Sequence, residues 1–155
     1  MNKVISRIQR AKTGKWELVS ESENLRTETG INQQALQMGE GYDGTASGTL
    51  YTQIAITQDT TSPASSMTNL WTEIAADGLS RKTATYSHTA DASSYTQTAS
   101  WQNSGSVYTI ATAALATTLT DANDSTDTHF AITAVSPVAV LDSSDTLEIQ
   151  WGIFY

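Results

Sequence analysis

The sequence contains no cysteine, which excludes disulfide cross-links and thiolate chemistry. Stability must therefore come from packing and assembly. No apolar run approaches the roughly 20 residues that cross a bilayer, and residues 1–7 lack the apolar core of a signal peptide. At 155 residues the chain has the size of one ordinary domain. We therefore expect a single soluble domain, spanning residues 1–155, that is made in a cytoplasm.

Charged side chains are scarce as well, at 15% of the residues, and 25 threonines and 18 serines carry most of the polarity. Threonine favours strands over helices. The net charge is −8, yet the first fifteen residues are purely basic, and no lysine or arginine follows Lys82. Because an acidic body repels nucleic acid and anionic membranes, we expect neither as a partner.

The basic residues at the start of the chain are candidates for docking a partner. They are Lys3, Arg7, Arg10, Lys12 and Lys15. Our interpretation is that they dock onto an acidic neighbouring subunit; the alternative is an edge hairpin whose charges are only solvated. Residues 4–11 and 16–20 have the composition of two short strands around a turn that contains Gly14, which predicts a β-hairpin within residues 1–23.

Alternating apolar residues predict further strands. The clearest is the last, in which every second residue from Leu147 to Tyr155 is apolar. Residues 82–88 and 95–101 are predicted to form a hairpin. Other strands are expected at 107–112, at 130–135 and at 50–56, where positions 50, 52, 54 and 56 share one face. Trp101 and Trp151 lie on apolar faces, which predicts core positions; Trp16 and Trp71 are left open.

One or two short helices are expected beside these strands. The apolar spacing within residues 27–38 predicts one helix, with Thr27 or Thr29 as its N-cap and Gly39 as its end. Leu70 to Gly78 is predicted to form one or two helical turns. About seven short strands with turn-rich connections favour an all-β fold, an antiparallel β-sandwich, over an α/β fold.

The motifs that resemble reactive or metal-binding sites are incomplete. Residues 39–44 match G-x-G-x-x-G, but the expected helix precedes them and a strand follows, the reverse of a dinucleotide site. Residues 121–127 resemble the start of an EF-hand calcium loop but lack its turn glycine and bidentate glutamate. His88 and His129 have no second histidine or cysteine at ligand spacing. We therefore expect no catalytic residue, no cofactor and no metal.

A polar connection is predicted around Pro63, in residues 58–66. Beyond it, Glu73 and Arg81 stand eight residues apart across a turn that contains Gly78. We expect them to form a bidentate ion pair that holds the connection against the sandwich. Free solvation of both side chains is the alternative.

A series of short motifs spans nearly the whole chain. They are, in order, NLRT at 24–27 followed by Gly30, IAIT at 54–57, TTSPA at 60–64, LWTEI at 70–74, LSR at 79–81, residues 95–101, and DTLEIQW at 145–151. This order resembles a family of small virion structural proteins of tailed bacteriophages, of the tail-fibre-like or minor structural kind. The chain departs from that family at residues 112–115, where a glycine is usual. The resemblance implies a β-sandwich displayed on the particle, without an active site.

The leading hypothesis is a non-enzymatic capsid decoration or cement subunit, located on the virion after synthesis in the host cytoplasm. We expect a homotrimer whose hairpin docks onto the major capsid protein or another virion protein, since weak contacts repeated by symmetry can stabilise a shell. The alternative is a tail-fibre or baseplate module that binds a host surface glycan, with Tyr42, Tyr51 and Trp71 as receptor contacts. A carbohydrate-active enzyme ranks third.

Overall fold

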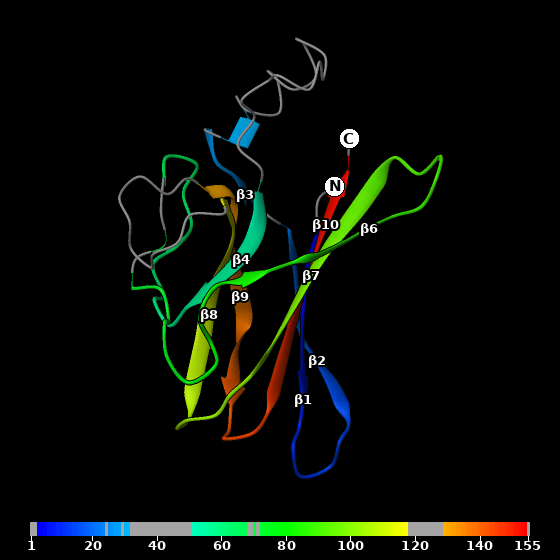
Figure 1. The fold of residues 1–155 in the computed structure, drawn as a ribbon. Helices are drawn as coiled ribbons and strands as arrows, with labels where there is room; N and C mark the ends of the chain where they lie inside the picture. Colours follow the sequence, from blue (N-terminus) through cyan, green and yellow to red (C-terminus); the bar gives the residue numbers. More distant parts are fainter. Residues whose placement is uncertain are drawn as a thin grey trace.

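The computed structural model describes residues 3–23, 25–28, 30–31, 51–67, 70, 72–117 and 129–154. They form two packed antiparallel sheets, a β-sandwich (Figure 1). The strands are β1 (Lys3–Gln9), β2 (Trp16–Glu23), β3 (Leu25–Arg26), β4 (Tyr51–Thr57), β5 (Lys82–Thr83), β6 (Thr85–His88), β7 (Ser94–Gln102), β8 (Tyr108–Thr117), β9 (His129–Leu141) and β10 (Thr146–Phe154). Sheet A has the order β2-β1-β10-β7-β6, and sheet B the order β3-β9-β8-β4-β5. The all-β sandwich predicted from the sequence is confirmed.

Strand β10 lies at the centre of sheet A, between β1 and β7. Successive side chains of a strand point to opposite faces of its sheet, and the buried residues of β10 are Leu147, Ile149, Trp151 and Ile153. The two fully buried tryptophans, Trp101 and Trp151, belong to this core, as expected. The indole Nε1 of Trp101 donates a hydrogen bond to the Ser80 carbonyl oxygen at 2.7 Å. The last strand is therefore an interior strand with neighbours on both sides.

Strand β4 is buried on both faces. Ile54 and Ile56 belong to the main core between the sheets. Ala55 belongs to a smaller core on the opposite face, where Leu70 of the connection that follows β4 packs against sheet B. Burial on both faces explains why residues 54–56 form a continuous apolar run.

The β1–β2 hairpin is part of sheet A, because β1 pairs with β10 along residues 3–9. Its turn is closed by hydrogen bonds from the Arg10 N–H to the Lys15 carbonyl oxygen at 3.1 Å and from the Gly14 N–H to the Arg10 carbonyl oxygen at 2.8 Å. Gly14 has a φ of 66°, a conformation that glycine adopts at little steric cost. In Figure 1 the turn extends below the other loops at this end of the molecule.

One helix start is present where the sequence predicts it. The Thr27 hydroxyl accepts a hydrogen bond from the Gly30 N–H at 3.0 Å, and the Thr27 carbonyl accepts one from the Ile31 N–H at 3.0 Å. This is the bonding of an N-cap. Residues 28, 30 and 31 are helical, and residues 32–38 lie outside the described residues. No helix in the described ranges is long and apolar enough to span a membrane.

Two predictions of local structure, a helix at residues 70–78 and a continuous strand at residues 82–88, are wrong. Residues 72–78 form turns and an isolated bridge between Glu73 and Thr57, not a helix. Thr72 and Asp77 have positive φ angles of 53° and 55°, which a right-handed helix excludes. The strand expected at 82–88 is split at Ala84, because β5 pairs with β4 in sheet B and β6 pairs with β7 in sheet A.

Candidate functional site

Three of the five basic residues predicted to dock a partner have acidic partners within the chain. Lys3 forms an ion pair with Glu21 across the hairpin, and Arg7 lies 3.8 Å from Glu148 of β10. Arg10 pairs with Glu17 at 3.0 Å and with Asp145 at 2.8 Å. Their charges are largely compensated, so these three residues contribute less to docking than the sequence suggested.

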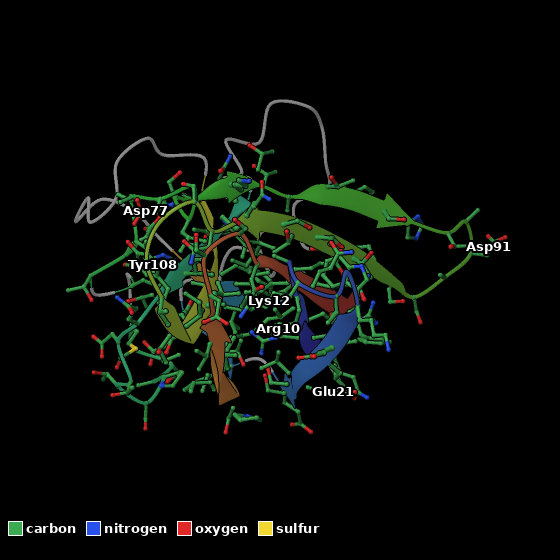
Figure 2. All side chains as sticks on the ribbon, turned by 90° about the horizontal axis from the view of Figure 1, so that it is seen from below. Arg10, Lys12, Glu21, Asp77, Asp91 and Tyr108 are labelled. Carbon is green, nitrogen blue, oxygen red and sulfur yellow. The ribbon has the colours of Figure 1, made fainter. Side chains whose placement is uncertain are left out.

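The remaining two, Lys12 and Lys15, are exposed in the turn and have no acidic partner among the residues that the structure describes. Beside them β2 presents two large apolar side chains to solvent: Trp16 is 47% exposed and Leu18 is 63% exposed. We call Lys12, Lys15, Trp16 and Leu18 the docking group. Figure 2 views this end of the molecule from below and labels Arg10 and Lys12 at the hairpin.

Asp145 anchors the base of the hairpin. Its carboxylate accepts hydrogen bonds from the Ala11 N–H at 2.9 Å and from Arg10 Nη1 at 2.8 Å. Arg10 Nη1 also donates to the Val140 carbonyl oxygen at 2.9 Å. One nearly buried carboxylate therefore fixes the hairpin turn against the β9–β10 loop, and the docking group starts from a rigid base.

The same contacts shift the pKa of Asp145. Burial raises the pKa of its carboxyl, but the hydrogen bonds from the Ala11 N–H and from Arg10 outweigh burial and leave the pKa below its ordinary value of 3.8. The hydrogen bonds to Asp145 and Glu17 in turn raise the pKa of Arg10. The ion pair therefore persists at neutral pH.

We expect the stability contributed by Asp145 to depend on pH. Because its folded pKa is lowered, this stability is complete above the unfolded pKa, near 3.8, and is lost as the pH falls through the folded pKa. Urea unfolding of the wild type and of Asp145→Asn should differ most near neutral pH and converge under acid. The pKa of Asp59 is also lowered, by hydrogen bonds from Thr61, but both proteins share that effect. A difference that stays constant from pH 7 to pH 2 would contradict the prediction.

A buried asparagine that the sequence analysis did not single out supports the same end of the sandwich. Asn103 is completely buried, and its amide Nδ2 donates to the carbonyl oxygens of Ser106 at 2.6 Å, Leu141 at 3.3 Å and Asp142 at 3.1 Å. Its Oδ1 accepts from the Gly105 N–H at 3.0 Å. Asn103 thereby joins the β7–β8 loop to the β9–β10 loop. A single Asn in a polar loop gives no pattern from which this role could be predicted.

A second contact holds the connection after β4 to the start of β8. The Tyr108 hydroxyl donates to Asp77 Oδ2 at 2.6 Å, and this hydrogen bond raises the pKa of the tyrosine. Figure 2 shows Asp77 and Tyr108 on the same side of the molecule. A Cβ on Gly105 would lie 2.1 Å from Asp77 Oδ2, so this glycine leaves room for the aspartate.

The predicted pair of Glu73 and Arg81 is present. Arg81 Nε donates to Glu73 Oε1 at 3.0 Å, and Arg81 Nη2 donates to Glu73 Oε2 at 2.6 Å. The Glu73 side chain is only 2% exposed and the Arg81 side chain only 10%. Glu73 also forms a β-bridge with Thr57, the last residue of β4. The pair therefore holds the connection that follows β4 against the sandwich, as expected from the sequence.

The receptor contacts proposed under the glycan alternative are not assembled in the described residues. Tyr51 is only 9% exposed and its ring packs against Phe130, with ring centroids 5.4 Å apart, so its assignment as a receptor contact is wrong. Tyr42 and Trp71 lie outside the described residues, as do residues 39–44 and the acidic loop at 121–127. Within the described residues, no group of three or more His, Asp or Glu side chains is arranged to hold a metal ion.

Fold and site together define an all-β sandwich with a rigidly anchored, basic and apolar hairpin. No protein-family model, no curated protein and no solved structure matches the chain.

Proposed function

We propose that this protein is a non-enzymatic structural subunit of a tailed-bacteriophage virion, and specifically a capsid decoration subunit that docks through its N-terminal hairpin. The docking group carries this proposal. It combines two lysines without acidic partners in the described part of the chain with two large exposed apolar side chains. The resemblance of the motif order to small phage virion proteins supports the same conclusion.

The chemistry of the docking group defines the partner surface. Tryptophan is enriched among the residues that dominate binding energy at protein interfaces, and lysines at the rim steer a partner of opposite charge. The partner surface is therefore an acidic surface with an apolar pocket, on the major capsid protein or another virion protein. Because the chain itself carries a net charge of −8, the same hairpin chemistry suits contacts between copies in a homotrimer.

Cryo-electron reconstructions of the particle with and without this protein test the proposed location. Loss of regularly repeated density over the capsid surface is expected when the protein is deleted. Density lost only at the tail or its fibres would overturn the capsid assignment while keeping the protein in the virion. A purified particle that contains none of the protein would overturn the virion assignment.

The docking group itself is tested by charge reversal. We expect Lys12→Glu combined with Lys15→Glu to weaken binding to particles prepared without the protein by about tenfold, with a flatter dependence on salt. Trp16→Ala should weaken binding by a similar factor at every salt concentration. Co-sedimentation of the protein with the particles measures both effects.

Lys82→Glu is the control, because it makes the same lysine-to-glutamate replacement, with half the total charge change of the double variant, at an exposed position in β5. It should bind like the wild type. Equal binding by the wild type and the Lys12/Lys15 double variant would contradict the proposed role of the hairpin.

A further inference from the structure

The β6–β7 hairpin carries an exposed surface that the proposed docking does not use. All four residues of β6 are exposed, and the strand is the last in sheet A. Figure 1 shows the hairpin reaching out to one side of the sandwich, and Figure 2 shows Asp91 at its tip, far from the hairpin labelled by Lys12. Part of this hairpin is therefore available to a ligand.

Three rings gather on one face of this hairpin. Tyr86, which is 60% exposed, lies 5.3 Å from Tyr95 of β7 between ring centroids, with the planes tilted by 40°. It lies 6.5 Å from His88, with the planes only 29° apart. This spacing matches the two-residue repeat of a strand, about 6.6 Å, so the near-parallel rings follow one another along β6. We call Tyr86, His88 and Tyr95 the aromatic face.

The aromatic face is held in place by its own hairpin. The strand register pairs His88 with Tyr95 and Tyr86 with Gln97. The His88 ring is within hydrogen-bond distance of the Ala92 carbonyl oxygen, Nε2 to O 3.1 Å. A platform that is ordered before binding loses less conformational entropy when a ligand arrives.

The surroundings of the face select a neutral, hydroxyl-bearing ligand. Within the hairpin, from residue 83 to residue 98, Asp91 is the only carboxylate and there is no lysine or arginine. Arg26 of β3 lies beside the hairpin, where its Nη2 donates to the carbonyl oxygen of Phe154, the residue paired with Ser94. The hairpin itself therefore offers no lysine or arginine to a phosphate or a carboxylate. Threonine, serine and glutamine provide the polar groups instead. Gln97, directly opposite Tyr86, has a buried Oε1 without a hydrogen-bond donor in the described residues.

We propose that the aromatic face is a binding site for a neutral carbohydrate. Aromatic rings offer an apolar surface with an electron-rich face, onto which the C–H groups of a sugar ring can stack, while its hydroxyls bond to the neighbouring polar side chains. This site shares no residue with the receptor contacts predicted from the sequence. Carbohydrate binding at this site does not depend on where the protein is located on the particle. An experiment that finds no such binding would therefore leave the capsid proposal unaffected.

The competing occupant is a second copy of the chain. Strand β6 contains no lysine, arginine, aspartate, glutamate or proline, and an unguarded edge strand can pair with another strand. We favour the carbohydrate because pairing through four residues buries much less than the roughly 1,200 Å² of a stable interface. Sedimentation of the free protein separates the two occupants.

The test is a printed array of neutral and anionic bacterial surface oligosaccharides, probed with the full chain. The best-binding oligosaccharide is then titrated while the tyrosine and histidine ring signals are followed by NMR. We expect a neutral oligosaccharide to bind and to shift the Tyr86, His88 and Tyr95 signals. Tyr86→Ala should weaken binding about tenfold, whereas Tyr86→Phe, which keeps the ring, should retain most of the affinity.

Two controls keep the result specific. Ser87→Ala changes the opposite face of the same strand, and Trp16→Ala removes an exposed ring from the other hairpin; both should bind the oligosaccharide like the wild type. Absence of binding to any array member, binding that survives Tyr86→Ala, or loss of binding equally in Trp16→Ala would each overturn the proposal. Self-association that Tyr86→Ala abolishes, without any bound sugar, would assign the face to a second copy.

Discussion

Replacing Glu73 by alanine is expected to destabilise the protein by about 3–5 kcal/mol, because it leaves the Arg81 guanidinium nearly buried without its carboxylate. The pair makes two hydrogen bonds, at 3.0 and 2.6 Å, and little solvent reaches either side chain. The free energy of unfolding in urea measures the loss. The bridge between Glu73 and Thr57 lies at the same point, so the connection that covers the outer face of sheet B should exchange its amide hydrogens faster as well.

Two controls separate the unpaired charge from the loss of side-chain volume. The double variant Glu73→Leu with Arg81→Met replaces the pair by apolar side chains and should recover most of the stability, because a buried pair often contributes little more than its apolar replacement. Glu148→Ala removes the partner of Arg7 in a partly exposed pair at 3.8 Å and should cost less than about 1 kcal/mol. A Glu73→Ala protein as stable as the Glu148→Ala protein would contradict this account.

The Glu73–Arg81 pair could be predicted because its two residues are close in sequence, with only a short turn between them. Arg10 also has a partner close in sequence, Glu17, seven positions away, but its second partner could not be predicted in the same way. Its closest carboxylate belongs to Asp145, which is 135 positions away. That contact exists because β1 pairs with β10 in sheet A. Strand pairing of this kind depends on the whole topology, and the spacing of residues along the chain does not report it.

The strands themselves could be predicted wherever one face is buried and the alternation is regular, as in β10. Tyr51 is an exception to this regular alternation. Strict alternation through residues 50–56 places Tyr51 opposite Ile54 and Ile56, on the polar face. The structure has a register irregularity between Tyr51 and Gln53, and one extra residue in a strand reverses the face of everything before it. Tyr51 therefore turns into the core.

The exposed rings of the β6–β7 hairpin were hidden from sequence analysis for a related reason. Alternation correctly groups Tyr86 with His88 on one face, and in most strands such a face is a core face. Here the hairpin reaches beyond the sandwich, so part of that face stays in solvent. How far one sheet extends past the other is set by tertiary packing, which a local pattern does not contain.

Asn103→Ala is the other substitution for which we expect a large effect, a loss of at least about 3 kcal/mol in the free energy of unfolding. It removes the donor of three hydrogen bonds to backbone carbonyl oxygens and the acceptor of the Gly105 N–H, and each buried polar group left unpaired costs about 1–3 kcal/mol. Asn103→Asp should be no better, because it keeps the acceptor but places a carboxylate beside carbonyl oxygens. Ser104→Ala, an exposed neighbour in the same loop, is the control and should stay within about 0.5 kcal/mol of the wild type.

The effect of Asn103→Ala should also reach the docking group. The Asn103 side-chain Nδ2 donates to the Asp142 carbonyl oxygen at 3.1 Å, and the Asp142 N–H donates to Asp145 Oδ2 at 3.2 Å, so the asparagine side chain holds the loop whose carboxylate anchors Arg10. Hydrogen exchange in Asn103→Ala should therefore accelerate at the Ala11 amide as well as in the β9–β10 loop. Acceleration confined to residues 103–106 would show that the hairpin keeps its position without this network, and that the rigidity of the docking group has its origin in the pairing of β1 with β10.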